Sequence, residues 1–214
     1  MIIAVDGPAA SGKGTIARAL ASHYGLPHLD TGLLYRAVGI GVLRAGGDPS
    51  LAGDAIAACG FSDGALNDPG LKSEAASRAA SLVSTHPAVR AALLDRQRRF
   101  ADRPGGAVLD GRDIGTVIAP HARAKLFVTA RPEIRAERRH AELVAAGMSV
   151  HYDAVLHDIR TRDERDSARA AAPLRMADDA MLLDTSNLDI VGAVSSAIAL
   201  VAHALHPAAN DRGD

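Results

Sequence analysis

A short apolar run followed by a glycine-rich segment places the strongest restriction on the fold of this chain. Ile2-Ile3-Ala4-Val5 is apolar on both faces, as expected of a buried central strand in a parallel sheet. Residues 6–12 are rich in Gly and Ala, and apolar residues then recur with helical spacing from Lys13 to Tyr24. The chain is therefore predicted to open as a strand, a glycine-rich turn and a helix.

The glycine-rich turn has the composition of a phosphate-binding loop and reads Gly7-Pro8-Ala9-Ala10-Ser11-Gly12-Lys13-Gly14-Thr15. Backbone N–H groups at a helix N-terminus can surround a triphosphate, and a lysine can reach its β and γ oxygens. We predict that these nine residues bind ATP and that Lys13 is catalytic, the alternative being an ordinary turn. Because Gly14 follows the lysine, Thr15 is predicted either to touch an α-phosphate or to reach the magnesium ion through water.

Further along the chain, short apolar runs alternate with helical patterns. Strands are predicted at 28–29, 107–110, 125–129 and 181–183, and helices at 31–45, 50–59, 71–84, 88–101, 132–146, 152–168 and 188–205. Residues 61–70 are rich in turn formers and are predicted to form a loop or a minimal hairpin, and the tail 206–214 is predicted to be disordered. The alternation indicates an α/β fold with a parallel sheet, whose ligands bind beyond the carboxyl ends of the strands.

Composition excludes several classes of protein. The net charge of −1 gives no overall basic field for a nucleic acid polymer, and Cys59 alone can form neither an internal disulfide nor a multi-cysteine metal site. The N-terminus lacks the pattern of a signal peptide, and the longest apolar stretch, residues 191–205, is too short and polar to span a bilayer. With 214 residues, the chain is predicted to be a single cytoplasmic domain that does not bind membranes.

Charged residues gather at two further places. Asp110 ends an apolar run, where it is predicted to bind magnesium directly or through water, or else to cap a turn, and Gly111 to Thr116 follow as a candidate ligand-binding loop or a surface turn. Between residues 160 and 169, Arg162, Asp166 and Arg169 fall on one face of a predicted helix. That face is either a solvated set of ion pairs or, in a phosphoryl-transfer protein, a source of positive charge for the reaction.

Together these segments resemble bacterial cytidylate kinases, a branch of the nucleoside monophosphate kinases. The resemblance covers nearly the whole chain and is carried by residues 7–15, 29–32 with 35–36, 86–90 with 97–98, 110–117, 162–163 with 165–166, 172–174 and 184–186. It implies a three-layer phosphate-loop kinase fold: a five-stranded parallel sheet flanked by helices, with a helical lid near 147–170 and an acceptor-binding insert near 60–101. Residues 60–70 are too short for the three strands usual in that insert, so we expect a reduced one.

The resemblance also implies roles for single residues. Lys13 would bind the transferred phosphoryl group, and Arg112, Arg162 and Arg169 would join it as catalytic residues. The residues implied in binding CMP are Thr31, Tyr35 and Arg36 around its phosphate, Ser81, Arg90 and Asp113 at the base, Arg162 and Asp166 at the sugar, and Arg112 and Arg169 as further phosphate ligands. A carboxylate with an arginine and a hydroxyl complements the donor and acceptor atoms of cytosine.

The activity implied is the ATP- and Mg²⁺-dependent phosphorylation of CMP and dCMP to CDP and dCDP by a protein that is expected to be a monomer. One alternative is another small-molecule kinase of the same fold, acting on UMP, AMP or a non-nucleotide acceptor. A second is a nucleotide switch that controls partner binding, against which stand the arginine-rich segment and the absence of an Asn-Lys-x-Asp motif.

Overall fold

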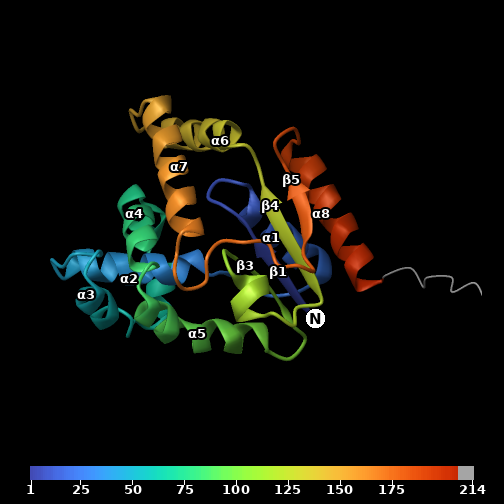
Figure 1. The fold of residues 1–214 in the computed structure, drawn as a ribbon, viewed down its shortest axis with the longest axis horizontal. Helices are drawn as coiled ribbons and strands as arrows, with labels where there is room; N and C mark the ends of the chain where they lie inside the picture. Colours follow the sequence, from blue (N-terminus) through green and yellow to red (C-terminus); the bar gives the residue numbers. More distant parts are fainter. Residues whose placement is uncertain (207–214) are drawn as a thin grey trace, which may run out of the picture. The chain divides into compact units, whose positions relative to one another are not determined.

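The computed structural model describes residues 1–206 (Figure 1). The tail predicted to be disordered lies, from residue 207 on, outside the described residues. The strands are β1 (Ile2–Asp6), β2 (His28–Asp30), β3 (Ala107–Gly111), β4 (Ala124–Thr129) and β5 (Met181–Asp184). The α-helices are α1 (Lys13–Tyr24), α2 (Gly32–Arg44), α3 (Ala52–Ala57), α4 (Glu74–Val83), α5 (Pro87–Ala101), α6 (Pro132–Ala145), α7 (Tyr152–Ser167) and α8 (Ile190–Leu205).

The five strands form one sheet in the order β2-β3-β1-β4-β5, in which β1 pairs in parallel with β3 and with β4, and β4 pairs in parallel with β5. Ile3 of β1 is opposite Val108 of β3 and Ala124 of β4, so the first strand of the chain is the central one. The predicted α/β class with a five-stranded parallel sheet flanked by helices is thereby confirmed. The phosphate loop and Asp110 lie at the carboxyl ends of adjacent strands because β1 and β3 pair in parallel.

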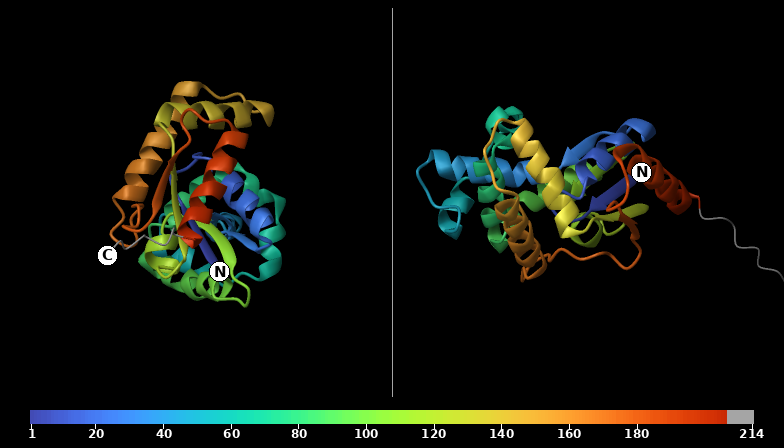
Figure 2. Two further views of the ribbon diagram at one scale, coloured as in Figure 1. Left: turned by 90° about the vertical axis from the view of Figure 1, so that its right-hand side faces the viewer. Right: turned by 90° about the horizontal axis from the view of Figure 1, so that it is seen from above.

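Helices α1 and α8 cover one face of this sheet (Figure 2). Ile16 and Leu20 of α1 and Val201 of α8 are buried with Val5 of β1 and Leu126 of β4 in one apolar cluster. Burial of each such side chain contributes about 1.5–3 kcal/mol, so this cluster holds the start of α1, and with it the phosphate loop, in a fixed place.

The chain divides into two compact units, one formed by residues 1–29 with residues from 101 on, the other by residues 30–100. The second unit is helical, and α2 crosses α4 closely at Gly39. A Cβ at Gly39 would lie 2.7 Å from the Cβ of Ala79, so only glycine permits this approach. The glycine thus serves helix packing within that unit.

Residues 60–70 contain no strand, so the hairpin alternative for this segment is wrong. Two 3₁₀ turns occur here instead, η1 (Asp63–Asn67) and η2 (Pro69–Lys72). Between them, the Asp68 carboxylate accepts a hydrogen bond from the Gly70 N–H and pairs with Arg44. The next helix begins at Glu74 rather than at residue 71, because the Ser73 hydroxyl caps it by accepting from the Ala76 N–H.

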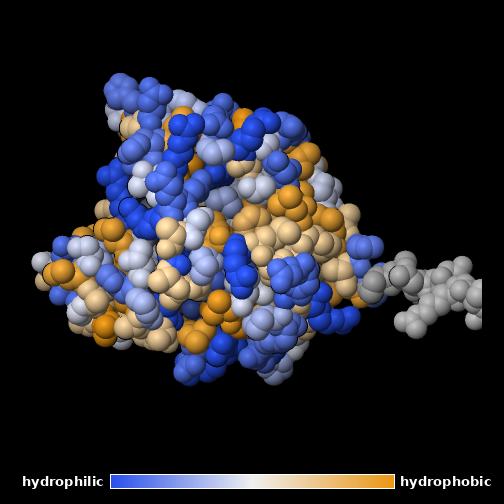
Figure 3. All heavy atoms as spheres, viewed as in Figure 1, coloured by the Kyte–Doolittle hydropathy of each residue, from blue (hydrophilic) through white to orange (hydrophobic). Residues whose placement is uncertain are grey.

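Apolar side chains gather on the surface over β5 and α8 (Figure 3), where Leu182, Ile190 and Val191 are exposed. Within the described residues, no helix is both long and apolar enough to cross a membrane.

One turn was not predicted from the sequence: residues Ile114–Ile118 form a single π-helical turn after β3. The buried carboxylate of Asp6 holds this turn, since its two oxygens accept the N–H groups of Ile114 and Gly115, both at 2.8 Å. Burial raises the pKa of Asp6 to about 7, against the opposing effect of these two hydrogen bonds; the Asp113 charge adds to the rise and Arg112 opposes it.

We predict a pH dependence of stability that originates at Asp6. Its pKa is higher in the folded than in the unfolded chain, so its contribution to the free energy of unfolding falls as pH rises from about 4 to about 7 and is constant above. The change is on the order of 4 kcal/mol. The side chain at position 6 of the variant Asp6→Asn cannot titrate in this range. In urea unfolding, the free energy of unfolding of this variant should therefore rise relative to that of the wild type from pH 5 to pH 8. A constant difference over that range would contradict the prediction.

Candidate active site

The phosphate loop leaves β1 through a close backbone contact. A Cβ on Gly7 would lie 2.0 Å from the carbonyl oxygen of Val128 in β4, which no side chain can tolerate. Gly12, at φ 88°, then turns the chain into α1 and accepts the N–H groups of Thr15 and Ile16 at its carbonyl, both at 3.1 Å. Since the first N–H groups of a helix have no intrahelical acceptor, the loop directs donors to the space before α1.

Lys13 and Ser11 carry the polar side chains of the loop. The Lys13 Nζ donates to the Pro8 carbonyl at 3.3 Å, which folds the ammonium back over the loop. The Ser11 hydroxyl is buried and has no hydrogen-bond partner within the described part of the chain. Both features fit a bound phosphate chain, which would accept from the ammonium and the hydroxyl.

Thr15, predicted as a possible metal contact, is exposed at the first turn of α1, and its hydroxyl accepts from Arg18 at 3.3 Å.

Asp110 is buried at the end of β3 and faces the phosphate loop. Its Oδ1 contacts His28 Nε2 at 2.7 Å, and its Oδ2 lies 3.7 Å from the position that a Cβ on Gly14 would take. No cluster of three acidic, His or Cys side chains suited to a metal occurs in residues 1–206. A magnesium ion here would therefore depend on Asp110 and on phosphate oxygens, the usual ligand set of this metal.

Two predicted arginines from separate segments meet at Asp166, near the end of α7. Arg112, after β3, donates its Nε to Asp166 Oδ2 at 2.7 Å, and Arg169 pairs with the other oxygen. Burial alone would raise the pKa of Asp166, but the charges of Arg112, Arg169 and Arg162 outweigh it and hold the pKa below its usual value. The carboxylate is thus ionised at neutral pH inside an arginine cluster.

The predicted single helical face needs one correction. Helix α7 ends at Ser167, so Arg169 lies beyond the helix. It reaches Asp166 from the segment that follows.

Asp113 is 4% exposed and begins the π-helical turn, since its carbonyl accepts the N–H groups of Val117 and Ile118 at 2.9 and 3.1 Å. Its charge contributes to the raised pKa of Asp6, which places the two carboxylates in electrostatic contact. The ligand-binding loop predicted after Asp110 is therefore a buried, ordered structure and not a surface turn.

The unit of residues 30–100 brings other predicted residues together. The Arg90 guanidinium lies 5.5 Å from the centroid of the Tyr35 ring, and it donates to the carbonyl of Ser84, whose hydroxyl donates to the carbonyl of Ser81. Arg36 donates to the Leu71 carbonyl at 2.8 Å. The buried polar residues of this unit include Thr31, Ser81 and Arg90, so the unit holds hydroxyl and guanidinium groups in an otherwise apolar setting.

Sequence reasoning missed several residues that order the loops. Asp6, His28 and Arg135 were given no role, although Asp6 and Arg135 are buried and hydrogen-bonded to loops that follow the strands, and the half-buried His28 is hydrogen-bonded to Asp110 in β3. For Asp6 a signal existed, because it ends an apolar strand just as Asp110 does. For Arg135 none existed, because it lies among other charged residues of a helix.

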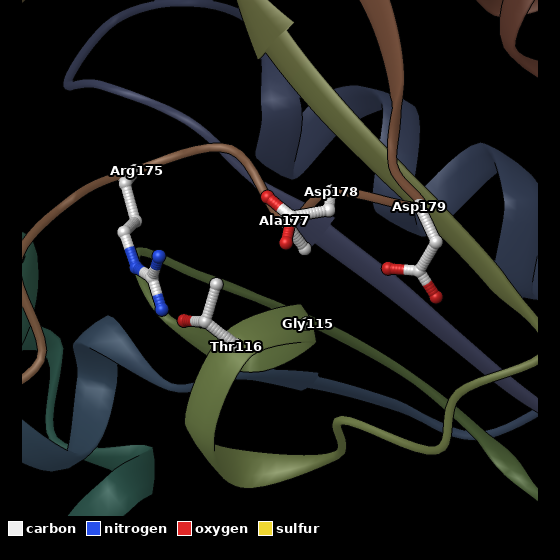
Figure 4. A pocket seen from close by; sticks show the side chains of 6 residues that line it. All are labelled: Gly115, Thr116, Arg175, Ala177, Asp178 and Asp179. Atoms are coloured by element: carbon white, nitrogen blue, oxygen red, sulfur yellow. The ribbon is translucent and has the colours of Figure 1, made fainter.

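A pocket of about 320 Å³ lies beside the π-helical turn (Figure 4). It is lined by Gly115, Thr116, Arg175, Ala177, Asp178 and Asp179, and the side chains of Arg175 and Thr116 point toward each other. Gly115 and Thr116 belong to the predicted loop of residues 111–116, but no residue predicted individually to bind ATP, CMP or magnesium lines the pocket.

Comparison with known proteins gives full-length matches. A family model described as cytidylate kinase matches residues 3–203. A protein of Xanthobacter autotrophicus named cytidylate kinase is 63% identical over 201 residues, which cover 94% of this chain and 97% of that protein. A cytidylate kinase of Azorhizobium caulinodans is 59% identical over 204 residues, covering 95% and 99%.

Among solved structures, a gluconokinase from Sinorhizobium meliloti matches with a TM-score of 0.53 at 18% identity, covering 96% of this chain and 93% of that one. A sugar kinase from Janibacter matches with a TM-score of 0.51 at 14% identity, covering 95% of each. These two show a shared fold only. The family model and the identities to full-length relatives show more: this chain belongs to the cytidylate kinase family.

Proposed function

We propose that this protein transfers the γ-phosphoryl group of ATP to CMP and dCMP, giving ADP with CDP or dCDP. The observation that carries the proposal is the match to cytidylate kinases along almost the whole chain, because a phosphate loop alone indicates only a nucleotide kinase. The geometry supports it: a loop suited to a triphosphate lies beside Asp110, and a buried arginine cluster is built around Asp166.

The reaction requires that the two substrates be positioned and that negative charge be stabilised, but it requires no general base. An oxygen of the acceptor phosphate attacks the γ-phosphorus, the bond to the β–γ bridging oxygen breaks, and ADP leaves with the electron pair. The attacking oxygen is already ionised at neutral pH, so no side chain has to remove a proton. Lys13 and the arginines stabilise the negative charge on the oxygens of the group in transfer.

We assign the ATP phosphates to the loop from Gly7 to Thr15, with Lys13 on the transferred group. The buried hydroxyl of Ser11 and the donors before α1 support this assignment. When bound, Mg²⁺ would neutralise charge on the phosphates, and Asp110 is the residue proposed to hold it. His28 would keep the Asp110 carboxylate oriented through their 2.7 Å contact.

Acceptor binding is assigned to residues of both units. In residues 30–100, we assign Thr31, Tyr35 and Arg36 to the phosphate of CMP and Ser81 with Arg90 to the base; the acceptor-binding insert proposed at 60–101 falls largely here. In the other unit, Asp113 would bind the base, Arg162 and Asp166 the sugar hydroxyls, and Arg112 and Arg169 phosphate oxygens. Arg112, Arg162 and Arg169 also act as catalytic residues in this proposal, and 147–170 forms the lid.

We further propose that the whole chain works as one kinase domain, as a cytoplasmic monomer with no nucleic acid polymer or membrane as partner. The near-neutral net charge supports the absence of a polyanionic partner.

An acceptor panel tests the activity directly. The purified protein is assayed with ATP, Mg²⁺ and CMP, dCMP, UMP, AMP or dTMP, with ADP release coupled to a recorded signal and the phosphorylated product identified. CMP and dCMP should give the highest kcat/KM. A higher kcat/KM with UMP, AMP or dTMP would reassign the acceptor, and slow ATP hydrolysis without any acceptor product would favour a nucleotide switch.

Replacing the loop lysine should abolish turnover without unfolding the protein. Lys13→Met keeps the aliphatic stem and removes the ammonium, so we expect kcat to fall by roughly 10³-fold or more while the thermal midpoint changes little. Lys72→Met is the matched control, because Lys72 is an exposed lysine to which no contact with ATP or CMP is assigned. A rate near that of the wild type in Lys13→Met would refute the assignment of this loop.

Removing the Asp113 carboxylate should relax base selectivity. Cytosine presents an amine donor where uracil presents an acceptor, so Asp113→Ala is expected to lower the CMP-to-UMP ratio of kcat/KM by about tenfold or more. Asp178→Ala, which removes an exposed carboxylate, serves as control. An unchanged ratio in Asp113→Ala would remove this residue from base recognition.

A further inference from the structure

Arg135 on α6 is a buried arginine that donates hydrogen bonds from all three of its guanidinium nitrogens. It is 3% exposed and donates Nε to the Ala130 carbonyl at 2.7 Å and NH1 to the Ala9 carbonyl at 3.2 Å. Its NH1 and NH2 also reach the two carboxylate oxygens of Asp163 on α7, at 3.0 and 2.6 Å. One guanidinium thus joins the end of β4, the phosphate loop and α7.

This arrangement requires an arginine. A buried charge is tolerated when it is paired and its donors are satisfied, and here the planar group meets a carboxylate with both terminal nitrogens while its Nε meets a carbonyl. A lysine would bring the charge but lacks the planar, five-donor group that meets these four acceptor atoms.

Apolar contacts also hold the phosphate loop, α6 and α7 together. Ala9 of the phosphate loop is buried in a cluster with Ala136 and Leu143 of α6 and Val155 and Ile159 of α7, and Ala10 packs against this cluster. Ala10 has a φ of 58°, a left-handed conformation that is unfavourable for a residue with a Cβ. The alanines of the loop are therefore part of a docking surface for the α6–α7 hairpin.

The position of Asp163 determines what the pair controls. It follows Arg162 directly and precedes Asp166 by less than one helical turn, so fixing Asp163 fixes the rotation of α7 about its axis. The charge of Arg162 acts on Asp166, and Arg112 and Arg169 bind that same carboxylate. The end of α7 that carries the arginine cluster is therefore set, through Arg135, by the phosphate loop.

We infer that Arg135 and Asp163 are positioning residues, which hold α7 on the phosphate loop so that Arg162 and Asp166 are in place for phosphoryl transfer. The inference rests on the roles proposed above for Arg162 and Asp166. Neither Arg135 nor Asp163 is assigned a contact with a substrate; both act through the helix that carries the cluster.

Steady-state kinetics of Arg135→Lys, Asp163→Asn and the double variant test this inference. We expect each single variant to lower kcat about tenfold or more while the KM for ATP changes less than about threefold, since an interaction of the transition state is lost. The double variant should be little worse than either single one, because both remove the same link. Asp163 is only partly buried, so Asp163→Asn provides the test should Arg135→Lys fail to fold.

Arg160→Gln and Glu133→Gln are the matched controls. Arg160 and Glu133 also join α7 to α6, at 2.8 Å, but both are exposed and neither is hydrogen-bonded to the phosphate loop. These variants should keep the wild-type kcat, because they remove an ion pair between the two helices without touching the link to the loop. An equal loss of kcat in the controls would overturn the inference.

Hydrogen exchange of the ligand-free protein gives a readout that does not depend on which acceptor is used. The amides of α7 should exchange faster in Arg135→Lys and Asp163→Asn than in the wild type and the controls. Unchanged exchange together with unchanged kcat would refute the positioning role. If the wild type fails to phosphorylate CMP while the two variants still exchange faster than it does, the proposed acceptor is refuted and the positioning role is not.

Discussion

The carboxyl end of β4 is the junction on which the phosphate-binding part of the structure depends. The Val128 carbonyl lies where a side chain at Gly7 would be, the Thr129 carbonyl accepts the N–H of Thr185 at 2.8 Å, and the Ala130 carbonyl accepts from Arg135. The last two residues of β4 and the residue that follows them thus contact the phosphate loop, the segment after β5 and helix α6. A displacement at this strand end would move all three together.

Thr185 closes this arrangement from the other side. Its hydroxyl contacts the carbonyls of Ser11 and Thr129, at 3.0 and 3.1 Å, and receives a hydrogen bond from Arg138 at 2.9 Å. The Arg138 guanidinium is thus bound to the segment after β5, where it also donates to the Thr185 carbonyl at 2.6 Å. Arginines at this edge therefore divide into those that order the backbone and those gathered at Asp166.

The sequence predicted the regular elements well, because their signals are local. Helix α1 begins at Lys13 and ends at Tyr24 as the apolar spacing indicates, and β3 places Asp110 at a strand end. The π-helical turn of Ile114–Ile118 was missed because it depends on Asp6, more than a hundred residues away. Lys125 was given no role, although its ammonium is buried and bound to Asp179 and the Pro120 carbonyl.

Only part of the candidate site could be predicted from the residues themselves. The phosphate loop followed from spacing and context, whereas the meeting of Arg112, Asp166 and Arg169 rested on family resemblance, since helical spacing alone put Arg169 on a helix that ends at Ser167. The pairing of Arg135 with Asp163 could not be predicted, because nothing in a charged helical sequence distinguishes a buried arginine from a solvated one. Burial and partners, which only the fold supplies, make that distinction.

Two buried carboxylates at this edge show how the fold turns similar residues to different uses. Asp6 is surrounded by backbone N–H groups, and burial raises its pKa to about 7; Asp166 is similarly buried, but the arginines around it hold its pKa low. Because Asp166 stays ionised, it keeps Arg112 and Arg169 in place while cancelling only part of the positive charge there. The remaining positive charge suits a phosphate group, so a chain with almost no net charge can still bind a polyanion locally.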